Sequence, residues 1–198
     1  MRVTIPLMLL FAVVLVMQPV AEAQEPPSPI ELKDIRYKSW VYPNISGEGR
    51  SDIRELSKGK KLMIVVYFAP WCPDWNNEIP FLKSMYEKYG KDGLGIVAVG
   101  EYDSRESMKA HFDAKGIPFV GVWETDSRDS RTLSEHYRYR KLAGDQRNWG
   151  TPWHIFLEPE KFPKDGDILA GKAWVANGKV IKDEAEPFIR KMLGLDAD

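Results

Sequence analysis

The hydrophobic pattern of the chain centres on two apolar runs separated by a segment of helical periodicity. Residues 62–68 and 94–100 are almost entirely apolar, with many β-branched side chains, as expected for strands buried on both faces of a parallel sheet. Between them, residues 74–89 carry apolar side chains at spacings of three and four, which predicts a helix with one buried face. A strand, a helix and a strand within about 40 residues predict a βαβ unit with a right-handed crossover.

Shorter elements are expected on both sides of this unit. Residues 30–47 mix apolar and charged positions and end in a glycine-rich turn, which predicts one or two short strands. The other expected elements are a single helical turn over 52–56, a helix over 104–115 with Ser104 as its N-cap, a strand over 119–123, a strand over 154–157, a strand pair over 168–180 that turns at Asn177-Gly178, and a helix over 184–193. This order of strands and helices predicts one α/β domain.

The segment 125–149 has the weakest pattern. It is highly charged, and Leu133, Tyr137 and Leu142 are spaced as one side of a weakly amphipathic helix. Charged segments of this kind are usually solvated. We therefore interpret it as a solvent-exposed helix and loop.

The N-terminus has the pattern of a secretory signal peptide. Residues 5–16 are strongly apolar, and Ala21-Glu22-Ala23 matches the small-residue pattern at which such peptides are cleaved. The apolar run is interrupted by Gln18-Pro19 and is shorter than the stretch of about 20 residues that spans a bilayer. The predicted organisation is a cleaved signal peptide over 1–23, a proline-rich linker over 24–29 and a single domain over 30–198.

Composition and charge narrow the function further. The chain has 198 residues, of which 28 are basic and 29 acidic, for a formal net charge of −1. This balance gives no reason to expect nucleic acid or an anionic membrane as a partner. We expect an exported monomer, periplasmic in a bacterium and secreted otherwise, that does not bind a membrane after signal cleavage. Its single cysteine, Cys72, is either a buried inert residue, a reactive thiol or a site of intermolecular pairing.

Cys72 lies where the first predicted strand passes into the first predicted helix, in the sequence Ala69-Pro70-Trp71-Cys72-Pro73-Asp74-Trp75. A helix N-terminus offers unpaired backbone N–H groups and the positive end of the helix dipole. Both stabilise a thiolate. We therefore interpret Cys72 as an accessible thiol.

This stretch resembles the active site of the thioredoxin-like superfamily. The Trp71-Cys72-Pro73 turn between strand and helix, followed by Glu78 and Pro80, is similar to the exported TlpA-like branch of thiol-disulfide oxidoreductases. The resemblance implies a thioredoxin-like α/β fold: a central mixed sheet flanked by helices, an N-terminal hairpin, and an inserted helix and strand, here 104–123. One position departs from the pattern, because Trp75 stands where the family has its second cysteine.

The same resemblance suggests residues that support the thiol. In the superfamily a threonine or valine followed by a cis-proline opens the strand beside the active cysteine, and Thr151-Pro152 matches this element. Such a proline withholds an N–H from the sulfur and leaves the preceding backbone free to pair with an extended peptide. Glu78 matches the family's glutamate, which we expect to tune the thiol, to donate protons, or to act as a structural cap or salt-bridge partner.

Aromatic residues around the cysteine are candidates for partner binding. Trp71, Trp75 and Trp153, together with Pro73, can form an apolar rim that suits a protein or peptide partner. In the alternative interpretation Trp75 and Trp153 fill the core.

The missing second cysteine restricts the chemistry. Thiol-disulfide exchange passes through a mixed disulfide that the second cysteine normally releases, so this chain alone cannot oxidise a substrate dithiol. Cys72 can form a mixed disulfide with a protein or peptide partner or with a small thiol, which another thiol must then resolve. Peroxide reduction is an alternative, but the peroxiredoxin pattern has Thr or Ser where this chain has Ala69.

We expect no cofactor and no metal. His111, His136 and His154 are not at ligand spacing from one another or from Cys72, and a copper site of the kind found in related exported proteins needs a second cysteine. Two functions remain: a monothiol redox protein, and a non-catalytic thioredoxin-fold module that binds a protein. Independent enzymatic activity is expected of neither.

Overall fold

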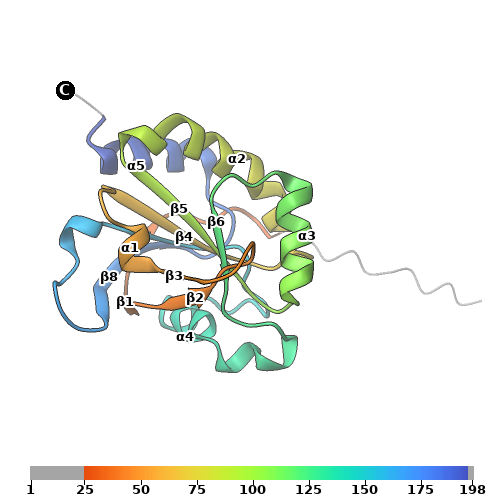
Figure 1. Ribbon diagram of the computed structural model, residues 1–198. Helices are drawn as coiled ribbons and strands as arrows, with labels where there is room; N and C mark the ends of the chain where they lie inside the picture. Colours follow the sequence, from red (N-terminus) through yellow and green to blue (C-terminus); the bar gives the residue numbers. More distant parts are fainter. Residues whose placement is uncertain (1–24, 196–198) are drawn as a thin grey trace, which may run out of the picture.

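Six strands form the central sheet of the protein (Figure 1). The computed structural model describes residues 25–195, so the predicted signal peptide at 1–23 lies outside the described residues. The strands, in their order across the sheet, are β1 (Glu31–Lys38), β8 (Ile168–Ala176), β7 (Trp153–Leu157), β4 (Leu62–Phe68), β5 (Leu94–Gly100) and β6 (Val120–Trp123). β4, β5 and β6 run parallel, whereas β7 is antiparallel to β4, β8 to β7, and β1 to β8. The predicted α/β fold with a mixed sheet is confirmed.

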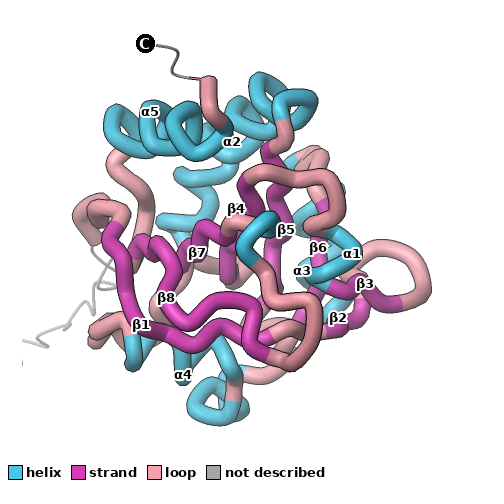
Figure 2. Tube along the Cα trace, turned by 90° about the vertical axis from the view of Figure 1, so that its left-hand side faces the viewer, coloured by secondary structure: helices cyan, strands magenta, loops and turns pink. Residues whose placement is uncertain are grey.

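Helices cover both faces of the sheet. α2 (Pro73–Tyr89) and α5 (Lys182–Leu193) lie on one face and α4 (Glu135–Leu142) on the other (Figure 2), while α3 (Arg105–Lys115) flanks the β6 edge. The smaller elements are the hairpin of β2 (Val41–Pro43) and β3 (Arg50–Asp52), the helical turn α1 (Ile53–Leu56), and 3₁₀ turns at Gly90–Asp92, Arg128–Leu133 and Pro159–Lys161. No helix within residues 25–195 is long and apolar enough to cross a membrane.

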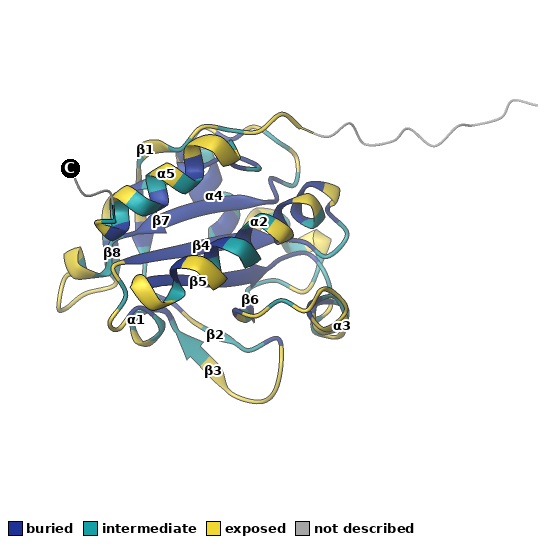
Figure 3. Ribbon diagram, turned by 90° about the horizontal axis from the view of Figure 1, so that it is seen from above, coloured by how far each residue is buried: buried dark blue, intermediate teal, exposed yellow. Residues whose placement is uncertain are grey.

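The strongest sequence patterns produce the best-defined elements. Every residue of β4 and β5 is buried, as their uninterrupted apolar runs require, and Figure 3 shows these strands beneath the outer helices. The helix predicted over 104–115 is present, and the Ser107 backbone N–H donates to the Ser104 hydroxyl at 3.1 Å, which confirms the N-cap. β4 and α2 therefore position Cys72 between a buried strand and a packed helix.

One predicted pairing of strands is wrong. Residues 168–180 do not form a strand pair: β8 ends at Ala176, and its neighbours are β7 and β1. The turn at Asn177-Gly178 leads instead to Val180, which forms a bridge with Ser28. This error concerns contacts between residues far apart in the sequence, which a local pattern does not contain. The expected N-terminal hairpin is present and is formed by β2 and β3, while β1 joins the edge of the main sheet.

The predicted linker is attached to the domain. The Ser28 backbone N–H donates to the Lys179 carbonyl at 2.7 Å, and the Glu25 backbone N–H donates to Asp74 Oδ2 at 3.2 Å. Asp74 lies two residues after Cys72. The described part of this segment therefore reaches the region of the cysteine.

The interpretation of 125–149 as a solvated helix and loop is wrong for α4, although the 3₁₀ turn Arg128–Leu133 before it buries no residue. α4 buries His136, Tyr139 and Arg140 against the sheet, while Leu133 and Leu142 are exposed. The two leucines that suggested a buried helix face are therefore exposed to solvent. Aromatic and charged side chains make the contacts with the sheet instead. The inner face of α4 therefore belongs to the core, and the end of the segment, with Arg147, Asn148 and Trp149, lines the site.

Candidate thiol site

Cys72 occupies the first turn of α2 at the end of β4. It is the N-cap of the helix, with extended backbone, and Pro73 follows as the first helical residue. The Cys72 backbone N–H donates to the Ala69 carbonyl at 3.0 Å, and the Asn76 side-chain amide donates to the Cys72 carbonyl at 2.9 Å. Only 7% of Cys72 is exposed. The thiol is thus held in a fixed place, recessed below the surface.

The loop before β7 supplies the polar group that faces the sulfur. The Thr151–Pro152 peptide bond is cis, as the resemblance implied. The Cys72 thiol donates to the Thr151 carbonyl at 3.1 Å. Elements separated by 79 positions in the sequence therefore meet at the sulfur.

A pocket of about 150 Å³ opens beside Cys72. The residues that line it come from the N-terminal segment, from the start of α2 and from the loop before β7: Glu25, Trp71, Cys72, Pro73, Asp74, Arg147, Asn148, Trp149, Gly150 and Thr151. Of the predicted site residues, the structure brings Trp71, Cys72, Pro73 and Thr151 together at this pocket. It does not bring Trp75 or Trp153 there.

Trp75 and Trp153 fill the core, so the rim proposed for them is wrong. Both are 0% exposed and lie on opposite faces of the sheet. Trp75 packs against Phe68, with ring centroids 4.9 Å apart, and its indole N–H donates to His111 Nε2 at 2.9 Å. The Trp153 indole N–H donates to Asn177 Oδ1 at 2.8 Å. An apolar tryptophan suits both a binding rim and a core position, so the sequence could not distinguish them. The complete burial of both side chains shows that they are core residues.

The aromatic partner of Trp71 is Trp149, a residue that sequence reasoning missed. Their rings meet edge to face, with centroids 5.3 Å apart. The Arg128 guanidinium lies 4.4 Å from the Trp71 ring centroid, and that of Arg131 lies 5.1 Å from the Trp149 ring centroid, within the range of cation–π attraction. Trp149 is two residues before Thr151, and that position is the signal that could have identified it.

A buried ion-pair network holds this loop in place. Arg140 and Asp145 have side chains that are 0% and 1% exposed and lie 3.5 Å apart, and Arg147 reaches Asp145 at 2.7 Å. Arg147 also donates to the Pro152 carbonyl at 3.2 Å. Gly150 has φ +66°, and a Cβ there would lie 1.3 Å from Arg140 Nη1, so no larger residue fits this backbone without displacing Arg140.

A second buried polar cluster supports Trp149 from behind. The Tyr102 ring lies 5.4 Å from that of Trp149, and its hydroxyl is hydrogen-bonded to His136 Nδ1 at 2.9 Å. The Thr125 hydroxyl donates to Glu101 at 2.5 Å. Burial raises the pKa of Glu101 well above its usual range and lowers the pKa of His136 well below its own. Burial therefore disfavours the charged form of both side chains.

Glu78 is buried on the inner face of α2, and its contacts are to the core. It accepts a hydrogen bond from the Val180 backbone N–H at 3.3 Å, and its carboxylate lies 3.7 Å from His154 Nε2. Burial raises the pKa of Glu78 to about 7 and lowers the pKa of His154 to about 3. Six residues of helix, about 9 Å of rise, separate Glu78 from Cys72. These contacts favour a structural role for Glu78.

The described residues offer no cluster for a metal. Within 25–195 there is no group of three or more His, Cys, Asp and Glu side chains placed to hold an ion. His111, one of the three histidines, is engaged with Trp75 instead.

Comparison with solved structures places this arrangement in the thioredoxin-like fold. A putative thiol:disulfide interchange protein DsbE from Chlorobium tepidum is 17% identical with a TM-score of 0.56, over 82% of this chain and 98% of that one. A thioredoxin family thiol:disulfide interchange protein from Chlorobium tepidum TLS is 20% identical with a TM-score of 0.57, over 87% and 100%. A secreted Mycobacterium tuberculosis disulfide oxidoreductase is 16% identical with a TM-score of 0.51, over 78% and 94%.

The family is established by sequence. The model of the AhpC/TSA family matches residues 31–159, more than half of the chain. The protein therefore belongs to the AhpC/TSA family, with a single cysteine at the strand-to-helix turn. Comparison with curated protein sequences finds no match.

Proposed function

We propose that this protein is an exported, monomeric, thioredoxin-like redox protein in which Cys72 forms mixed disulfides with protein or small-thiol partners. The observation that carries the proposal is the position of the sulfur. It lies at the N-terminus of α2, beside the Thr151 carbonyl that precedes a cis-proline, and at the wall of a pocket. A helix N-terminus stabilises the thiolate that attacks a disulfide.

The proposed exchange has two steps. The Cys72 thiolate attacks one sulfur of a partner disulfide, a new disulfide forms between them, and the other partner sulfur leaves as a thiolate that takes up a proton. A thiol from outside the chain then attacks the mixed disulfide, becomes bonded to the partner sulfur and returns Cys72 to the reduced state. The external thiol is required because Trp75 cannot perform this second attack.

Export is supported by two observations. Residues 1–23 have the pattern of a secretory signal, and one protein of the same fold is described as secreted. The proposed location is the periplasm in a bacterium and the exterior otherwise.

The alternative is a binding module of the same fold in which Cys72 no longer reacts, and the low exposure of Cys72 favours it. Alkylation of the purified protein by iodoacetamide, with Cys72→Ser as the blank, separates the two. The redox function predicts that native Cys72 reacts at least as fast as the same residue in denaturant. Protection by more than about 100-fold, the behaviour of an inert structural thiol, would leave only the binding module.

A further inference from the structure

Two cationic side chains without an acidic partner lie against the tryptophans of the pocket, just outside the residues that line it. Arg128 contacts the rings of Trp71 and Trp149, and Arg131 contacts Trp149 and the Asn148 side chain and carbonyl. Neither forms an ion pair with any residue between 25 and 195. These four residues, Trp71, Trp149, Arg128 and Arg131, are called the arginine–tryptophan wall below.

The other charges at the pocket are largely neutralised within the protein. Asp74 is paired with Lys179 at 2.6 Å, and Arg147 with Asp145 at 2.7 Å. Glu25 is the remaining acidic residue of the lining. Within the lining, Glu25 is thus the charge left without an ion-pair partner among residues 25–195, whereas the unpaired charge beside the two tryptophans is positive. An anionic group is complementary to the tryptophan side.

Unpaired polar atoms within the pocket lining point independently to a ligand. Thr151 is 5% exposed and lines the pocket, yet its hydroxyl has no hydrogen-bond partner among the described residues. The same is true of the buried indole N–H of Trp71. Buried polar groups normally have a partner, and a ligand that accepts hydrogen bonds would supply one.

We propose that the pocket binds a small thiol, or its disulfide, that carries carboxylate groups. Its sulfur would meet Cys72, and a carboxylate would lie against Arg128 and Arg131. The inference rests on the proposed function of Cys72 and names its substrate class. A pocket of about 150 Å³ is the size of a cavity that admits a single benzene-sized group, which suits the sulfur end of a small molecule better than a folded protein segment.

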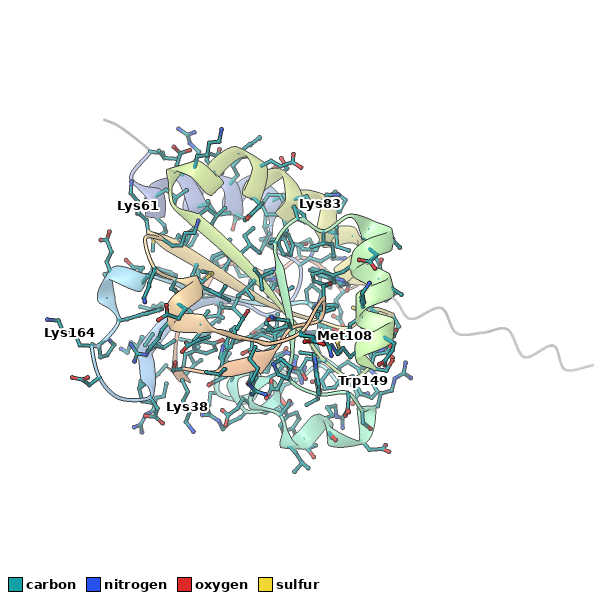
Figure 4. All side chains as sticks on the ribbon, in the orientation of Figure 1. Lys38, Lys61, Lys83, Met108, Trp149 and Lys164 are labelled. Atoms are coloured by element: carbon teal, nitrogen blue, oxygen red, sulfur yellow. The ribbon has the colours of Figure 1, made fainter. Side chains whose placement is uncertain are left out.

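The test compares three small disulfides of different charge: oxidised glutathione, which is anionic, 2-hydroxyethyl disulfide, which is neutral, and cystamine, which is cationic. The second-order rate of adduct formation on Cys72 is measured by intact mass in the purified protein and in Arg128→Glu and Arg131→Glu. Lys164→Glu is the matched control, because Lys164 is exposed and lies on the opposite side of the molecule from Trp149 (Figure 4).

The anionic disulfide is expected to react about 10-fold faster than the cationic one, a modest electrostatic steering effect. Each arginine reversal should lower that ratio about 3- to 10-fold, because charges at the rim of a site act on the association rate. Lys164→Glu should leave it unchanged. Equal rates for all three disulfides, or an equal loss for all three in the arginine variants, would overturn the inference while the function of Cys72 stands. Adducts with none of them would overturn the proposed function itself.

Discussion

Cys72 and Trp75 lie one helical turn apart, yet their surroundings are opposite: Cys72 lines a pocket, whereas Trp75 is packed in the core. Cys72 borders a pocket, its thiol directed to the Thr151 carbonyl. Trp75, at the position of the family's second cysteine, is 0% exposed and hydrogen-bonded to His111 of α3. The second position is therefore a packed part of the core rather than an empty place in the site. The absence of a second thiol is therefore part of the packing between α2 and α3.

The most disruptive change is to restore a cysteine at the second position. Trp75→Cys should lower the free energy of unfolding by about 3 to 5 kcal/mol, the cost of truncating a buried tryptophan. In the folded fraction, the new thiol should attack a mixed disulfide on Cys72 and release the small thiol. Trp75→Ser is the matched control, with a similar cavity and no thiol. Denaturant unfolding and intact mass measure both effects, and an adduct that persists equally in the two variants would show that the second position cannot reach the sulfur.

The next largest effect is expected at the ion-pair network behind the pocket wall. Asp145→Ala leaves the buried Arg140 without its partner and should cost about 3 to 5 kcal/mol of unfolding free energy. It should also change the reaction rate of Cys72, because Arg147 would lose the contact that holds it beside Pro152. As a control, Asp113→Ala removes an exposed pair with Lys109 and should cost less than about 1 kcal/mol. Equal losses in both variants would contradict the role of the network.

Glu78, on the buried side of α2, should make the stability of the protein depend on pH. Burial raises the pKa of Glu78 from 4.5 to about 7, so the folded state keeps a proton that the unfolded chain loses. This contribution is complete below pH 4.5 and is lost as the pH rises through 7. The stability of the protein relative to Glu78→Gln should therefore fall by at most about 3 kcal/mol between pH 4 and pH 8.

Urea unfolding over that pH range measures the difference, with Glu87→Gln, at an exposed position of the same helix, as the control for loss of a carboxylate. His154 is present in both proteins, so its own titration largely cancels. A difference that does not vary with pH would contradict the raised pKa, because it would mean that Glu78 has the same pKa in the folded and unfolded states.

The central unit of the fold could be predicted from the sequence because its signals are local. The runs at 62–68 and 94–100 are apolar at nearly every position, and only strands buried on both faces satisfy such a pattern. The position of Cys72 followed from the strand and helix on either side of it. The cis-proline element followed from a family resemblance and not from the residues alone.

The loop over 147–150, which lines the pocket beside Cys72, could not be predicted in the same way. It follows a charged segment. The buried Arg140–Asp145 pair and the packing of Gly150 against Arg140 hold it in place. Charged residues predict exposure unless their partners are known, and those partners are tertiary. The position of Trp75 shows the same limit, because an apolar residue at a helix start suits either a rim or a core.

The most direct test of the single-thiol function follows the fate of an adduct on Cys72. The protein is treated with 2-hydroxyethyl disulfide, excess reagent is removed, and intact mass is recorded over time without and then with a small thiol, with Cys72→Ser as the blank. We expect one adduct that persists until the thiol is added and then disappears. Failure of the native protein to form the adduct, or its loss without added thiol, would contradict the proposed function.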